Sequence, residues 1–191
     1  MSDRHSFRHP LAPRPIGAAE AADREAQRHL VAAYGHGIDA LVLSLYHEDG
    51  TDDHPPYYSG SAKGFVAWLP GMMARWKATS HVTSQALYAV DGDRADGEVT
   101  ARTWHLTADG TRQFVAWGRY ADRYEKRAGI WRFAHRAFIL DHAEDLPVVA
   151  GDDFGSAGVS VGAAGPNDPV YRRLALFARS GPAHAPVTPA S

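Results

Sequence analysis

Hydrophobic residues in the first half of the chain recur with the period of an α-helix. In residues 19–34, Leu30 and Tyr34 fall on one stripe, and charged side chains occupy the other faces. Ser61 is placed to cap a later helix, within which Pro70 predicts a break or a kink. The pattern therefore predicts three helices, over residues 19–34, 39–50 and 61–78.

Beyond Thr79 the hydrophobic period changes to the alternation of a strand. Turn sequences at 91–93, 108–110 and 127–129 separate the strand-like runs, and links this short join antiparallel neighbours. Residues 51–60 predict a loop or a short edge strand, because their adjacent prolines exclude a central strand. An antiparallel meander of four strands is predicted over residues 80–90, 94–107, 112–127 and 129–142.

Helices that precede a run of strands indicate an α+β fold in which the helices cover one face of the sheet. We expect a cone-shaped α+β barrel, with three N-terminal helices packed on a strongly curved antiparallel sheet and a pocket at its open end. Composition divides the chain further. It predicts a disordered arm over residues 1–18, one folded domain over 19–145, and a Gly-, Ala- and Pro-rich extension over 146–191 with a short helix near 168–179.

The second predicted strand indicates which sheet face points inward. One of its faces carries charges, whereas the other is small and mostly apolar and leaves room for a ligand. Alternation does not decide the inward face of the first strand. The residues expected inward on the second and third strands are Ala95, Gly97, Val99, Ala101, Thr103, His105, Phe114, Ala116, Gly118 and Tyr120.

Composition narrows the classes of function. The formal net charge is −2 and gives no sign of nucleic-acid binding, and there is no cysteine for disulfides or thiolate metal sites. The N-terminal sequence lacks the apolar core of a secretory signal, and no apolar run approaches the length of a membrane span. We therefore expect a cytoplasmic protein without a nucleic-acid or membrane partner.

The order of helices, loop and four-strand meander resembles the SnoaL-like branch of the nuclear transport factor 2-like superfamily. The stretches that carry the resemblance are YGHGIDALVLSLYHEDG, SHVT and GRYADRYEKRAGIWRFAHR, within residues 20–142. The chain is most similar to pocket enzymes of that branch, such as scytalone dehydratase, bile acid 7α-dehydratase and hexachlorocyclohexane dehydrochlorinase. The superfamily also holds polyketide cyclases, ketosteroid isomerases, dioxygenase β subunits and non-catalytic members, so the fold alone does not decide the function.

The resemblance implies a catalytic set of four residues. Asp39 would orient His81, which would remove a proton from the substrate while a leaving group departs. Tyr34 would donate to a substrate oxygen, and Arg136 would hold an anionic or carbonyl group. We expect further substrate contacts from Thr103, His105, Tyr120, Ala101 and Trp68. The implied activity is that of a cofactor-independent lyase or isomerase acting on a small, apolar, oxygenated molecule of steroid or polyketide type.

Each catalytic candidate also has a simpler structural interpretation. Asp39 could cap the helix that follows it, with its side chain on the backbone N–H of Val42. His81 is alternatively a surface histidine, and Tyr34 a core tyrosine with a satisfied hydroxyl. Strict alternation turns Arg136 away from the inner face, so it reaches the pocket only through a bulge and is otherwise a surface or interface arginine.

The segment HEDGTDDH, residues 47–54, has the composition of a metal-binding cluster. Its spacing fits neither an HExxH helix nor an EF-hand loop. A solvated acidic loop is therefore predicted, and we expect neither a metal nor another cofactor.

The charged face of the predicted sheet also carries tryptophans. An exposed sheet face of this kind is an unusual apolar patch on a monomer, and we expect a homodimer or homotrimer to bury it. The C-terminal helix is predicted to pack as a lid over the pocket or as a clasp between subunits. We call the charged face the outer sheet face; its predicted members are Thr100, Arg102, Trp104, and Trp117 or Arg119.

Overall fold

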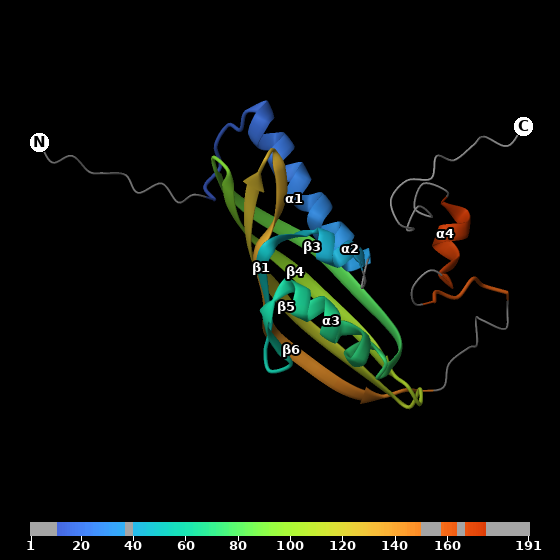
Figure 1. The fold of residues 1–191 in the computed structure, drawn as a ribbon. Helices are drawn as coiled ribbons and strands as arrows, with labels where there is room; N and C mark the ends of the chain where they lie inside the picture. The colour runs from blue at the N-terminus through green and yellow to red at the C-terminus, as the bar shows by residue number, and fades with distance from the viewer. Residues whose placement is uncertain (1–10, 37–39, 150–157, 164–166, 175–191) are drawn as a thin grey trace, which may run out of the picture. The chain divides into compact units, whose positions relative to one another are not determined.

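The computed structural model describes residues 11–36, 40–149, 158–163 and 167–174 of the 191-residue chain. The chain forms two compact units, Met1–Val148 and Val149–Ser191. The helices of the first unit are α1 (Ala18–His36), α2 (Ala40–Ser44) and α3 (Ala62–Met73) (Figure 1). Its strands are β1 (Tyr46–His54), β2 (Tyr58–Ser61), β3 (Trp76–Asp91), β4 (Arg94–Thr107), β5 (Arg112–Arg127) and β6 (Ile130–Pro147).

These strands form one six-stranded sheet in the order β2-β1-β6-β5-β4-β3. The four long strands β3 to β6 are an antiparallel meander, as the sequence predicts. However, β1 runs parallel to β6, so the sheet is mixed and not wholly antiparallel. The sheet curves, with the three helices against one face (Figure 1), and β2 and β3 remain its open edges. The α+β fold is confirmed, with a curved sheet that does not close into a barrel.

The second predicted helix is wrong over its second half. It ends at Ser44 as α2, and the residues from Tyr46 onward form β1. Backbone pairing with β6 explains the difference, because the N–H of Phe133 donates to the carbonyl of Leu45 at 2.9 Å and Tyr46 pairs with Phe133. The two prolines of the following segment lie between β1 and β2, where no strand requires their missing N–H groups.

The helix α3 begins where the sequence predicts and ends earlier. The hydroxyl of Ser61 accepts the N–H of Gly64 at 3.1 Å and caps the helix. Pro70 lies inside the helix without ending it, since its carbonyl accepts the N–H of Ala74 at 3.0 Å. The predicted helix continued to residue 78, but the chain from Trp76 onward pairs with β4 as β3.

The core lies between α1 and the inner face of the sheet. Leu30 and Val31 of α1 are buried there, and α1 packs against β3 and β6. Gly97 of β4 is required by close packing, because a Cβ at this position would lie 2.9 Å from the ring of Tyr124 and 3.0 Å from that of Tyr88. The small residues predicted on the inner face of β4 therefore make room for large rings from β3 and β5.

The outer sheet face carries both tryptophans that the sequence places there. Trp104 donates to the side-chain oxygen of Gln113 at 2.9 Å, and the guanidinium of Arg102 lies 5.5 Å from the ring centre of Trp117. Exposed aliphatic residues, Val82, Leu87 and Ile139, also belong to this face. The face thus combines apolar area with charge, as predicted.

The described part of the second unit contains a short helix, α4 (Pro169–Arg173). Asp168 caps it by accepting the N–H of Val170 at 2.8 Å. The predicted helix ran to residue 179, and its last part lies outside the described residues. Among the helices of the described residues, none is long and apolar enough to cross a membrane.

Candidate active-site pocket

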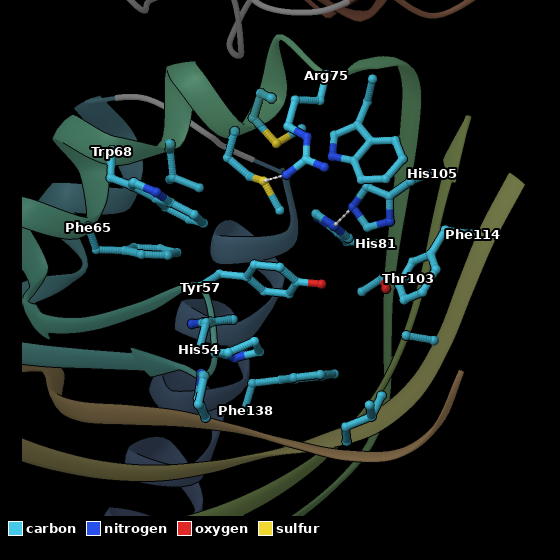
Figure 2. A pocket seen from close by; sticks show the side chains of 18 of the residues that line it. His54, Tyr57, Phe65, Trp68, Arg75, His81, Thr103, His105, Phe114 and Phe138 are labelled. Atoms are coloured by element: carbon cyan, nitrogen blue, oxygen red, sulfur yellow. Dashed lines mark hydrogen bonds between the residues drawn. The ribbon is translucent and has the colours of Figure 1, made fainter. Parts of the chain in front are cut away.

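A cavity of about 280 Å³ lies between α3 and the inner face of the sheet (Figure 2). The helix supplies a continuous apolar stripe, because residues three and four positions apart share one face. This stripe consists of Phe65, Trp68, Leu69 and Met72. Aromatic residues of β5 and β6, Phe114 and Phe138 among them, form the opposite wall. A concave, mostly apolar wall with few polar groups is typical of a small-molecule site.

Two histidines from neighbouring strands meet in this wall. The Nε2 atoms of His81 on β3 and His105 on β4 lie 3.3 Å apart (Figure 2). Burial lowers the pKa of His81, with a smaller contribution from His54. Burial and the neighbouring His81 lower the pKa of His105 to about 4. Both imidazoles are therefore neutral near pH 7, which is the state in which an imidazole accepts a proton.

Two buried nitrogens beside this pair have no hydrogen-bond partner among the described residues. They are Nδ1 of His105 and Nε1 of Trp76, whose rings are 4.8 Å apart between centres. Both residues line the cavity. Buried polar atoms in a protein normally have a partner, so this corner of the pocket is suited to a polar group of a ligand.

A third imidazole lines the pocket from β1. The Nδ1 of His54 bonds to a carboxylate oxygen of Asp52, which is fully buried. The other carboxylate oxygen of Asp52 accepts the hydroxyl of Tyr46. The pocket therefore contains a His–Asp pair that no sequence pattern indicated.

Behind the pocket wall lies a buried ion pair. Arg136 is fully buried and donates to both carboxylate oxygens of Asp122, from Nε at 2.8 Å and from Nη2 at 2.7 Å. Burial alone would lower the pKa of Arg136, but the Asp122 carboxylate raises it well above its ordinary value. The guanidinium carbon lies 4.1 Å from the ring centres of both Tyr34 and Tyr120, so aromatic rings stand between this charge and the cavity.

The same two tyrosines supply phenol groups to the wall. Burial raises the pKa of Tyr34 well above its ordinary value and the pKa of Tyr120 to about 12. Both hydroxyls therefore keep their protons at neutral pH and can donate to a substrate oxygen. Their rings meet edge to face, with centres 5.7 Å apart.

Most of the predicted site residues come together at this cavity. Six of them line it: Tyr34, Trp68, His81, Thr103, His105 and Tyr120. Ala101 is instead buried in the hydrophobic core and is not part of the cavity wall. Asp39 lies outside the described residues.

Arg136 reaches the interior through the bulge that the sequence argument required. Ala134 is an extra residue in β6 relative to β5, because the pairing changes from Phe133 with Tyr124 to His135 with Arg123. The bulge turns Arg136 inward, where it is fully buried, so it is not the surface or interface arginine of the alternative interpretation. Its hydrogen bonds go to Asp122 and not into the cavity, and it does not line the cavity.

The acidic segment 47–54 is a strand and not a solvated loop. Its alternating residues Asp52 and His54 point to the interior, whereas Asp53 pairs outward with Ser59. Spacing by two on a strand is the only signal that could have revealed the pair. The adjacent prolines and the high charge of the segment concealed it. Within the described residues no group of three His, Asp or Glu side chains is arranged to hold a metal ion.

Comparison with known proteins identifies a matching domain family and several similar structures. Residues 19–137 match the model of the SnoaL-like domain family. A Novosphingobium aromaticivorans protein, provisionally named a scytalone dehydratase, is 19% identical over 73% of this chain and 98% of its own, with a TM-score of 0.63. The LinA-type3 hexachlorocyclohexane dehydrochlorinase from Novosphingobium barchaimii LL02 is 18% identical over 66% of this chain and 92% of its own, with a TM-score of 0.62.

A variant of Rv3472, a Mycobacterium tuberculosis protein of unknown function, is 25% identical over 64% of this chain and 78% of its own, with a TM-score of 0.56. Among curated proteins, none matches this sequence. The structural likenesses establish a shared fold, on which several activities are known to be built.

Proposed function

The chain belongs to the SnoaL-like domain family, and on that premise we propose that it is a cofactor-independent lyase or isomerase. The reaction is removal of a proton beside a carbonyl group, followed by elimination of a leaving group or migration of a double bond. One observation carries the proposal: neutral His81 and His105 meet in a mostly apolar cavity. A desolvated neutral imidazole is a competent base near pH 7.

In this proposal His81 is the base, and Asp39 orients it. The carboxylate would hold one ring nitrogen of His81 in the donor tautomer and stabilise the imidazolium that forms. The support is positional. Asp39 follows α1, which ends at His36, and a side chain at Gly35 would begin 3.7 Å from the carbonyl oxygen of His81. The end of α1 therefore lies beside His81 on β3.

The phenols of Tyr34 and Tyr120 stabilise the negative charge that develops on the substrate carbonyl. A hydrogen-bond donor in a dry pocket stabilises such an oxyanion more strongly than water does, because it needs no reorganisation. Arg136 acts from behind, where its guanidinium packs against both rings and fixes the wall. Thr103 and Trp68 complete the substrate contacts.

The cavity volume limits the substrate. An apolar protein cavity of about 150 Å³ is known to hold benzene, and the cavity here is about 280 Å³. This volume suits one aromatic ring with a short oxygenated chain, or two fused rings. A small polyketide-type aromatic molecule therefore fits better than a whole steroid. The fold neighbours named as a dehydratase and a dehydrochlorinase support elimination as the reaction.

A β-hydroxy ketone of this size, 4-hydroxy-4-phenylbutan-2-one, tests the proposal. The enzyme should convert it to benzylideneacetone, whose conjugated absorbance is followed directly. His81→Ala should lower kcat/KM by at least ~100-fold, the usual contribution of a general base. His142→Ala is the matched control, since its side chain is 65% exposed and stacks on Trp117 of the outer sheet face.

Two results would contradict the proposal. One is full activity of His81→Ala. The other is a wild-type protein that binds benzylideneacetone, seen as a change in tryptophan fluorescence, but neither forms it nor exchanges the α-protons of the related ketone benzylacetone. That second result would favour the alternative of a non-catalytic ligand-binding module.

A further inference from the structure

The His–Asp pair of β1 is not used by the proposed reaction, although it lines the same cavity. His54 is clamped between two rings, with Phe65 stacked on one side at 5.0 Å and 12° and Phe138 on the other at 5.8 Å and 3°. Figure 2 shows its side chain at the pocket wall beside Phe138. Stacking on both faces leaves only the edges of the imidazole free for hydrogen bonds.

The two edges of the His54 ring have different environments. Nδ1 faces the carboxylate of Asp52, and because an ionised carboxylate can only accept, Nδ1 must carry the proton of that bond. Nε2, on the opposite edge, makes no hydrogen bond to any described residue. Since the ring lines the cavity, Nε2 is the atom available to a substrate.

The environment of Asp52 strengthens this arrangement. Its carboxylate is fully buried and also accepts the hydroxyl of Tyr46, so its orientation is fixed. The nearest buried cation, Arg136 on the paired strand, gives its hydrogen bonds to Asp122 instead. His54 is therefore the group that balances the charge of Asp52 whenever Nε2 also holds a proton.

We propose that His54 is the general acid that protonates the leaving oxygen, with Asp52 and Tyr46 as positioning residues. This inference rests on the proposed elimination, in which His81 is the base. His81 lies on β3 and His54 on β1, and both line one cavity from different strands. An elimination needs this separation, because the proton and the leaving group depart from adjacent carbon atoms.

The step balances without any further reactant. His81 takes the proton beside the carbonyl, and the electrons of that C–H bond form the new C=C bond. The C–O bond breaks, and its oxygen takes the proton from Nε2 of His54, so that water leaves. His81 is then an imidazolium and His54 is neutral, with its Nδ1 proton still donated to Asp52. Proton return from His81 to His54 through solvent restores both groups.

Three probes that share one phenylbutanone skeleton separate the roles. The first, 4-hydroxy-4-phenylbutan-2-one, needs a proton on its leaving group. The second, 4-acetoxy-4-phenylbutan-2-one, releases acetate, which leaves without one. The third, benzylacetone, has no leaving group and reports proton removal alone, as deuterium uptake in D₂O. Only the first depends on a general acid.

We expect His54→Gln to lower kcat/KM for the hydroxy ketone by at least ~100-fold, while acetate elimination and deuterium uptake change by less than about threefold. His81→Ala should abolish all three. Asp52→Asn should lower the hydroxy-ketone reaction and move the alkaline limb of its pH–rate profile to lower pH, a change that lost stability alone would not cause. His135→Gln is the control, because this histidine contacts the side chain of Thr51 at 2.8 Å and does not line the cavity.

The outcomes distinguish the inference from the proposal on which it rests. If His81→Ala is inactive but His54→Gln affects all three probes equally, or none, the general-acid role is refuted and the proposed function stands. If the wild type acts on no probe, the proposed function fails and the general-acid role fails with it.

A measurement on the wild type keeps the inference testable if the His54 variant does not fold. The ketone 4-hydroxy-3,3-dimethyl-4-phenylbutan-2-one keeps the hydroxyl but has no proton to eliminate beside it. Its binding should shift the Nε2 resonance of His54 in a ¹⁵N spectrum of the histidine rings. A shift of the His81 resonances with none at His54 would overturn the assignment.

Discussion

Loss of Asp122 should be among the most destabilising single changes in this chain. Both Asp122 and Arg136 have side chains with 0% exposure, and two hydrogen bonds of 2.7 and 2.8 Å join them. Asp122→Asn removes the negative charge and leaves a guanidinium that no water can reach. Removing one partner of a buried ion pair costs about 3–5 kcal/mol, because the remaining charge is uncompensated. Asn also keeps a single acceptor oxygen for the three hydrogen bonds that Asp122 accepts from Arg136 and Tyr124.

Urea denaturation followed by tryptophan fluorescence measures this cost as a fall in the midpoint at unchanged slope. Asp145→Asn is the matched control. It breaks an ion pair with Arg112 whose side chains are 60% and 48% exposed, and exposed pairs contribute at most about 1 kcal/mol. The double change Asp122→Leu with Arg136→Met should recover most of the loss, since neither charge of this pair remains buried. A loss below about 1 kcal/mol for Asp122→Asn would refute the argument that burial dominates this pair.

Other predictions follow from local features. Ser61→Ala removes the cap of α3 and should lower the free energy of unfolding, measured in urea, by about 1 kcal/mol. The control Ser59→Ala, on the exposed strand β2, should change this free energy little. Equal losses in the two variants would contradict the capping role. Burial lowers the pKa of His105 from 6.5 to about 4. On acidification, His105 therefore takes up a proton at a higher pH in the unfolded chain than in the folded protein. Stability should therefore fall by about 2 kcal/mol between pH 6.5 and pH 4, after allowance for partial exposure, and His105→Gln should remove this part of the loss. Light scattering should find a homodimer or homotrimer that Trp117→Lys on the outer sheet face dissociates; a monomeric wild type would refute that interface. A chain ending at Val148 should lose activity or assembly if the second unit is a lid or a clasp, and unchanged behaviour would exclude both.

The long strands could be predicted because two independent signals agreed. Alternation of apolar residues and short glycine-containing turns both place β4 at 94–107 and β5 at 112–127, which are the bounds the structure has. The prediction of the second helix was wrong over its second half, because the local helical pattern conflicts with a tertiary strand pairing. Leu45 and Tyr46 continue a helical apolar pattern, yet their backbone is bound to β6, a contact between residues far apart in the sequence.

The inner face of two strands could not be predicted because bulges interrupt the alternation. In β3 the pairing slips between Thr83 and Ala86, so His81 before the bulge and Tyr88 after it both point inward although they have opposite parity. In β6 the extra residue Ala134 turns Arg136 inward, although Arg136 and the inward Phe133 have opposite parity. A bulge adds one residue to one strand and carries no distinct composition here, so alternation alone cannot locate it.

The two buried carboxylates show why polar residues in this pocket have different roles despite similar burial. Asp122 faces a permanent cation, Arg136, whose guanidinium packs against the ring of Tyr120, so the charge of Asp122 is compensated in every state of the protein. Asp52 faces an imidazole whose proton can be transferred, so its compensation changes with the state of His54. A pair with a fixed charge stabilises structure, whereas a pair whose charge varies can donate a proton at low cost when a substrate oxygen is present. The difference between the partner residues, and not the depth of burial, assigns Asp122 to the scaffold and Asp52 to the proposed chemistry.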